Sequence, residues 1–245
     1  MKKAKLILIT VFIFCFSFIK AQNIAINNEV GIFLGPTFMQ TDYGEAHNFD
    51  SSINNTGFGF GFAYIADFSD SRVSSKLGRL LTEHVKLRAD FSYVKVNFAY
   101  DGQPVEALTL ESQKFRAMTG GTKLLNFGIY SEIYIKNLVN DNKFQPYILT
   151  GVSYVSAKPS IKTSMELPNI YLPEEENIFL DKQTFLSLGA GVGARYNLDN
   201  IDFVVEYRFN AFLSDRIEGL EAHFSGNKNN DAQTSINLGV VFSLE

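Results

Sequence analysis

Three histidines are the residues of this chain best suited to acid–base chemistry. His47 and His223 lie in long polar stretches, and His84 begins an alternating segment. A hydrolase would need one of them held at hydrogen-bonding distance from a serine or an aspartate. The sequence shows no recognisable set of this kind, so we expect no enzyme and no catalytic residues. A lipid-modifying hydrolase that depends on one of the histidines is kept as an alternative.

Acidic and glycine-rich runs offer weaker candidates for metal or phosphate binding. The acids around His47, within residues 42–50, share one polar loop, which is poor evidence for a site. The run PEEEN at 173–177 lacks the ligand spacing of a calcium loop. Glycine alternates with other residues in GFGFGF and GAGVG, whereas a phosphate loop joins a strand to a helix. We therefore expect no metal ion and no cofactor.

Ten charged residues form a sharper pattern, because each lies on the less apolar side of an alternating segment. Residues two apart on a strand point to the same face, so Glu206 would lie beside Arg208, and a tight hairpin would bring Arg195 towards Asp202. Inside a narrow barrel each charge needs a partner, since an isolated buried ion is very costly. We interpret the set as an inward-facing network of salt bridges that locks the lumen, with a proton or ion path as the alternative. Its members are Glu29, Asp67, Lys86, Arg88, Asp90, Glu132, Arg195, Asp202, Glu206 and Arg208.

These charges lie in eight segments whose apolar residues recur at every second position, the signal of strands with two different faces. In IDFVVEYRFNAFL the apolar set runs from Ile201 to Leu213. Near Val94 the phase slips, which predicts a β-bulge. The segments are 29–39, 57–68, 84–98, 124–135, 146–156, 184–196, 201–213 and 234–244.

The connections between the segments alternate in length. Short ones include KNLVNDNKF and NLDN, and long ones cover roughly 41–56, 99–123, 157–183 and 214–233. An even number of strands with short turns opposite long loops is typical of an outer-membrane barrel, whose short turns lie in the periplasm. We expect an all-β fold, an eight-stranded antiparallel up-and-down transmembrane β-barrel in the cell outer membrane.

Two features favour lipid rather than a protein core against the apolar face. The opposite face is rich in glycine and serine, whereas a solvated face usually carries many lysines and glutamates. Tyr64, Tyr196 and Phe242 stand towards segment ends, where membrane barrels carry aromatic girdles. The alternative is a secreted soluble lipid-binding barrel with its apolar face inward.

The N-terminal stretch MKKAKLILITVFIFCFSFIKA has a basic start, an apolar run and a small final residue. We therefore expect residues 1–21 to be a cleaved signal peptide and 22–245 to be the barrel domain. Removal of its four lysines changes the formal charge from −4 to −8, which argues against nucleic acid as a partner. The single cysteine, Cys15, lies within this stretch and is removed by its cleavage, so no disulfide is expected.

One connection, residues 69–83, breaks the alternation of lengths and would lie in the periplasm. Residues 74–76 can start a short helix with leucines on one face, and its basic residues make the segment positively charged. The segment could dock a periplasmic or lipoprotein partner, or fold over the barrel mouth. The candidate contact residues are Arg72, Lys76, Leu77, Arg79, Leu80 and Leu81.

Five stretches carry a resemblance over nearly the whole chain after residue 21: NEVGIFLGPTFMQTDYGE, HVKLRADFSY, KFRAMTGG, QPYILTGVSYV and FLSDRIEGL. They resemble a family of flavobacterial (Bacteroidota) outer-membrane β-barrel proteins without an assigned activity. That family is similar in size and layout to PorG-like barrels, which serve the type IX secretion machinery. The resemblance implies a non-enzymatic structural or accessory protein of the envelope, with outer-membrane lipid and envelope-complex components as partners. Adhesion through the long loops is a further alternative.

Overall fold

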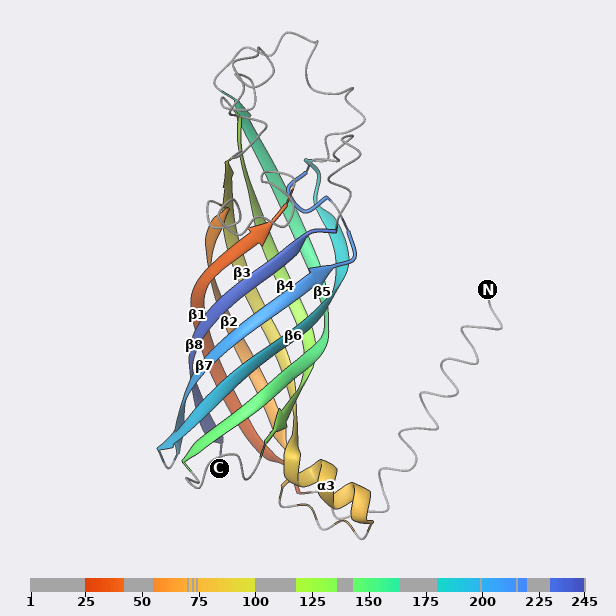
Figure 1. Ribbon diagram of the computed structural model, residues 1–245, viewed down its shortest axis with the longest axis vertical. Coiled ribbons are helices and arrows are strands. Elements are labelled where there is room, and N and C mark those ends of the chain that lie inside the picture. The colour runs from red at the N-terminus through yellow and green to blue at the C-terminus, as the bar shows by residue number, and fades with distance from the viewer. Residues whose placement is uncertain are drawn as a thin grey trace, which may run out of the picture.

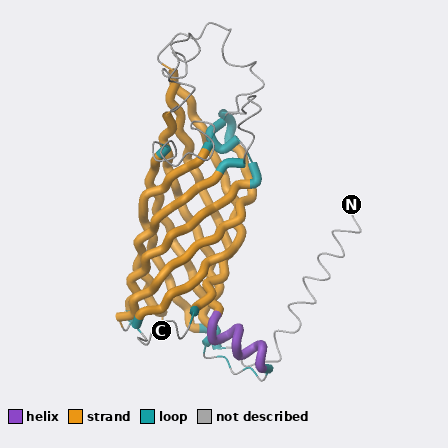
Figure 2. The backbone as a smooth tube through the Cα atoms, in the orientation of Figure 1, coloured by secondary structure: helices purple, strands orange, loops and turns teal. Residues whose placement is uncertain are grey.

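The computed structural model describes residues 25–41, 55–69, 71, 73, 75–99, 118–135, 143–163, 180–198, 200–214, 216–219 and 230–244 (Figure 1). In these ranges the chain forms eight strands and one helix, coloured by type in Figure 2. They are β1 (Asn27–Gln40), β2 (Thr56–Asp67), α3 (Lys76–His84), β3 (Val85–Ala99), β4 (Met118–Tyr134), β5 (Phe144–Thr163), β6 (Gln183–Leu198), β7 (Ile201–Phe212) and β8 (Ala232–Leu244). The expected signal peptide, Arg72, His47, His223 and both acidic clusters lie outside the described residues.

Each strand pairs antiparallel with its neighbours in sequence, and β8 pairs with β1 to close the sheet into a barrel. The predicted fold class, an all-β eight-stranded antiparallel barrel, is confirmed. Closure leaves no free strand edge, which matters in lipid because no water is present there to satisfy unpaired backbone groups. β1 begins and β8 ends at the end of the barrel that carries α3 (Figure 1). β1, β3, β5 and β7 end at the opposite end, where the four long connections begin.

The period-two pattern places the large apolar side chains on the outside. Phe58, Phe60, Phe62 and Tyr64 occupy alternate positions of β2 and are each about half exposed. The residues between them face the lumen. The alternative of a soluble barrel with an inward apolar face is therefore wrong, since these rings point away from the interior. No helix among the described residues is long and apolar enough to cross a membrane.

The bulge predicted near Val94 is wrong. β3 stays in continuous register with both neighbours, and Val94 lies opposite Gly59 and Leu124. Val94, Val96 and Phe98 instead face inwards and are buried. The apolar side of the strand changes because the lumen becomes apolar towards the long connections, so no residue has to be inserted.

An apolar cluster fills this part of the lumen, and the sequence did not suggest it. Ile217, from the segment that follows β7, reaches into the cluster, and its backbone N–H donates to Asp231 Oδ2 at 2.9 Å. The end of the barrel that carries the long connections is therefore plugged by side chains. The buried members are Met39, Val94, Val96, Phe98, Leu124, Val155, Ala157, Phe212 and Ile217.

β4 and β5 extend further towards the long connections than expected. They remain paired from Leu124 opposite Ala157 to Met118 opposite Thr163. The outward positions in this extension include Lys123 instead of a large apolar side chain. The outward apolar pattern thus stops at the border of the lipid-facing surface, while the ladder of hydrogen bonds continues beyond it.

Gly35 offers a test of barrel closure. A Cβ at this position would lie 1.8 Å from the carbonyl oxygen of Ile236, across the seam between β1 and β8. We expect Gly35→Ala to lower the free energy of unfolding by about 1–3 kcal/mol, the usual cost of overpacking. Urea unfolding in detergent micelles, followed by the gel mobility of unheated samples, measures this change.

Gly59→Ala is the matched control for the closure test. Its Cβ would meet the Val94 side chain at 3.1 Å, and the nearest backbone atom would be 3.6 Å away. A side chain can move aside more easily than the backbone of β8, which is held by β1 and β7 on its two sides. Equal losses of stability in the two variants would contradict a special sensitivity of the seam.

Candidate functional site

The ten charged residues singled out in the sequence all point into the lumen, where their side chains form one connected network of ion pairs. Arg88 of β3 is at its centre. Its guanidinium lies 2.5 Å from Asp90, 2.8 Å from Glu206 and 3.2 Å from Glu132. Arg88 is 2% exposed and the two glutamates are 0% exposed, so these charges depend on one another rather than on water.

Arg195 of β6 links two further parts of the network. Its guanidinium pairs with Glu29 at 2.6 Å and with Glu132 at 2.7 Å. It also reaches Asp202 at 3.4 Å across the hairpin between β6 and β7, the approach suggested by the sequence. Glu29 is shared with Lys86, whose Nζ lies 2.6 Å away. One carboxylate thereby joins cations from two strands.

The remaining pairs complete the network. Lys86 Nζ lies 2.9 Å from Asp67, at the end of β2. Arg208 pairs with Glu206 at 2.7 Å and with Asp90 at 2.8 Å. Every one of the ten residues therefore has an oppositely charged partner, which limits the cost of burying them.

Two tyrosines stabilise the network, and the sequence interpretation missed them. The Tyr134 hydroxyl donates to Glu132 at 2.6 Å, and the Tyr147 hydroxyl donates to Glu206 at 2.8 Å. Six acids and four bases make up the network, so these neutral donors help to stabilise the excess carboxylates. Their inward direction could have been read from the phase of the alternation in their strands.

Inward glycines make room for these and other rings. A Cβ on Gly193 would lie 2.4 Å from Cζ of Tyr147, and a Cβ on Gly128 would lie 2.4 Å from Cε2 of Tyr130. The Tyr130 ring in turn lies 4.6 Å from the Arg208 guanidinium, in a cation–π contact. The glycines expected to suit a narrow lumen thus complement particular aromatic side chains.

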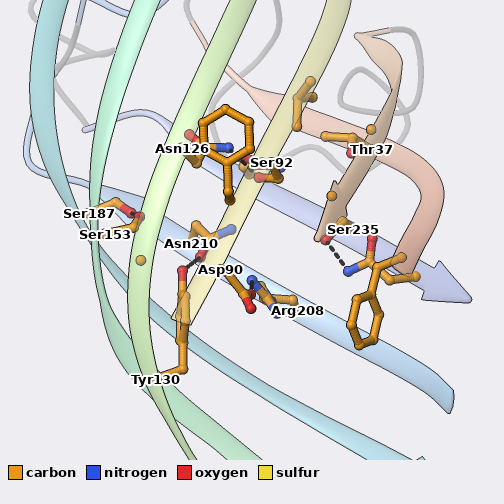
Figure 3. Close-up of a pocket in the computed structure, with 18 of the residues that line it drawn as sticks. Thr37, Asp90, Ser92, Asn126, Tyr130, Ser153, Ser187, Arg208, Asn210 and Ser235 are labelled. Atoms are coloured by element: carbon orange, nitrogen blue, oxygen red, sulfur yellow. Dashed lines mark hydrogen bonds and ion pairs between the residues drawn. The ribbon is translucent and has the colours of Figure 1, made fainter. Parts of the chain in front are cut away.

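A cavity of about 50 Å³ with a mixed polar and apolar lining lies between the ion network and the apolar cluster (Figure 3). Its lining includes Asp90 and Arg208 from the network and Val94 and Phe212 from the cluster. The volume has room for about three water molecules. The side-chain oxygen of Asn126, which also lines the cavity, accepts no hydrogen bond from the described residues and is suited to bind one of them.

The charged side chains that the structure describes in the lumen are paired with one another. The described residues include His84, whose Nδ1 lies 3.1 Å from the backbone oxygen of Leu80 in α3. Within the described ranges, no three His, Cys, Asp or Glu side chains are grouped so that they could hold a metal ion. The hydrolase alternative and the expectation of no enzyme both stay predictions.

The expected short helix is present as α3. The Ser75 side chain caps it by accepting a hydrogen bond at 3.0 Å from a backbone N–H in the first turn. Leu77, Leu80 and Leu81 share one face and are between 50% and 68% exposed. Figure 1 shows α3 extending to the side of the barrel end, so it does not cover the barrel mouth.

A closed eight-stranded barrel with an apolar outer belt and sealed ions defines an outer-membrane β-barrel protein. The chain belongs to the family described as the outer membrane protein beta-barrel domain, whose model matches residues 15–243. This result confirms the predicted location in the bacterial outer membrane. No curated protein matches the chain.

Solved structures share the fold. A major outer membrane protein from Thermus thermophilus has a TM-score of 0.53 at 12% identity, over 90% of this chain and 100% of its own. Neisserial surface protein A has a TM-score of 0.47 at 14% identity, over 90% of this chain and 99% of its own. Ail, the attachment invasion locus protein of Yersinia pestis, gives 0.43 at 11% identity, over 89% and 98%. At these identities the likeness concerns the fold alone.

Removing Arg88 tests whether the pairing of charges holds the barrel together. Arg88→Met keeps most of the side-chain volume but leaves Glu132 and Glu206 buried without this partner. We expect the free energy of unfolding to fall by about 3–5 kcal/mol. Urea unfolding in detergent micelles measures the loss.

Asp202→Asn is the control at the edge of the network. The Asp202 side chain is 13% exposed and lies 3.4 Å from Arg195, and the amide oxygen of the variant can still accept hydrogen bonds. We expect a cost of about 1 kcal/mol or less. If Arg88→Met lowered the free energy of unfolding no more than this control does, the pairing of charges would not be what stabilises the barrel.

Proposed function

We propose that this outer-membrane barrel is a non-enzymatic structural or accessory component of an envelope complex and recruits a periplasmic protein through α3. The supporting observation is the leucine face of α3, formed by Leu77, Leu80 and Leu81, which is exposed in the chain on its own. Short connections and chain ends of such barrels lie in the periplasm, so a periplasmic partner can reach this face.

The leucine face is presented in a defined orientation. Gly78, at the side of this face, contacts Val73, since a Cβ on this glycine would lie 2.3 Å from a Val73 methyl group. The other end of α3 continues directly into β3. Burying one leucine fully contributes about 1.5–3 kcal/mol, so three on one face favour a partner with an apolar groove. Lys76 lies beside these leucines on the helix and favours an acidic residue at the rim of that groove.

The filled lumen supports a role without transport or catalysis. Ion pairs, a small cavity and an apolar cluster follow one another along the interior. An eight-stranded barrel has just enough room for its side chains. A protein of this kind acts through its surfaces, which agrees with an anchoring role.

The type IX secretion machinery is the envelope complex to test first. The reason is the resemblance of the sequence motifs to a family similar to PorG-like barrels. An anchored periplasmic helix is what an accessory subunit of such a machine needs to hold soluble components at the membrane.

A charge placed on the leucine face should abolish recruitment. Leu81→Glu introduces a carboxylate where the partner would bury an apolar side chain, so we expect recovery of the partner to fall at least about tenfold. Affinity purification from cross-linked envelopes, with quantitative mass spectrometry of the co-purified periplasmic proteins, measures it. Thr82→Glu adds the same charge to the next residue, away from the leucines, and should leave recovery unchanged. Unaltered recovery with Leu81→Glu would refute recruitment through this face.

The lumen offers a separate test of the non-conducting part of the proposal. In planar lipid bilayers we expect the full barrel to give no steady single-channel current, because the ion pairs and the apolar cluster block the interior. A large porin inserted under the same conditions serves as the positive control. Regular channel openings from the purified protein would contradict a sealed lumen.

A further inference from the structure

Three lysines form a row across neighbouring strands on the outer surface of the barrel. Lys95 of β3 lies opposite Lys123 of β4, and Lys123 lies opposite Lys158 of β5. All three are exposed, while their neighbours in sequence, such as Val94 and Leu124, are buried in the lumen. Paired strands are about 4.8 Å apart, so the lysine row spans roughly 10 Å.

The lysine row lies at the border of the apolar belt. From Val85 to Lys95 the strand advances by ten residues, which corresponds to about 25 Å along the axis of a tilted barrel and matches the height of the hydrocarbon band. Directly below Lys95 is Tyr93, whose ring centroid lies 6.0 Å from that of Phe60. The row is therefore level with the lipid headgroups on the side of the long connections, which is the outer leaflet.

The positive charge of the lysine row is not compensated by the part of the chain that the structure describes. Like charges directly opposite on paired strands destabilise a sheet, and Lys123 has a lysine on both sides. No described acid pairs with any of the three, whereas each of the four cations in the lumen binds two or three carboxylates. An anion from outside the chain would relieve the repulsion.

We propose that the lysine row binds the phosphorylated headgroup of an outer-leaflet lipid, whose acyl chains lie on the aromatic surface below. A phosphate offers several acceptor oxygens to neighbouring ammonium groups. A lipid fits better than free phosphate because the row adjoins apolar surface directly: Phe58, at the same level on β2, is 55% exposed. The site lies at the other end of the barrel from α3 and is independent of the proposed recruitment.

The experiment uses the full barrel in micelles of an uncharged detergent. Dioleoyl phosphatidic acid is added, with dioleoylglycerol as the same lipid without phosphate and inorganic phosphate as the free anion. We expect the thermal unfolding midpoint to rise with phosphatidic acid and to stay constant with the other two at equal concentration. Each lysine at an anionic lipid surface contributes about fivefold to binding, so K95Q/K123Q should need roughly 25-fold more phosphatidic acid for half the effect.

K76Q/K143Q is the matched control, because it removes the same charge from the opposite end of the barrel. It should respond to phosphatidic acid as the wild type does. K95Q/K123Q should also unfold at a higher temperature than the wild type in pure detergent, since repulsion within the row is reduced. The proposal is overturned if the wild type does not respond to phosphatidic acid, if inorganic phosphate acts equally well, or if both variants lose the response alike.

Discussion

Closure of the sheet by the pairing of β8 with β1 is the constraint on which the rest of the structure depends. In hydrocarbon every backbone N–H and C=O must be bonded within the protein, and a closed sheet achieves this without an edge. With eight strands the interior is narrow and has to be filled by side chains. The alternating pattern then sends large apolar residues to the lipid and leaves the lumen to small, charged and aromatic ones.

The contents of the lumen follow from the cost of burying them. Charges such as Glu132 and Glu206 are tolerated because each meets arginines and a tyrosine hydroxyl. Glycines stand where rings approach the wall, as Gly193 does beside Tyr147. Ion pairs and an apolar cluster fill the interior, so both proposed contacts with other molecules use the outer surface. Two features of that surface are unsatisfied by the described chain, the leucine face of α3 and the lysine row.

Most of the fold could be predicted because the alternation is local. A residue in a strand faces the lipid or the lumen according to its position alone, so the inward set of charges and the leucines of α3 could be identified from their spacing. The prediction failed where the surroundings change along a strand. At Val94 the lumen becomes apolar, which looked like a bulge, and the ends of β4 and β5 pass beyond the lipid, where outward residues such as Lys123 are polar.

The sequence by itself determined the strands, the face on which each residue lies and the capped helix, because all of these depend on neighbours a few residues away. Only the tertiary structure decided which side chains meet. Arg88 and Glu206 are 118 residues apart, and the lysines of the row come from three different strands. Their contacts depend on the register between strands and on the closure of the barrel. Both are set by hydrogen bonds between segments far apart in the sequence, so no short stretch of residues predicts them.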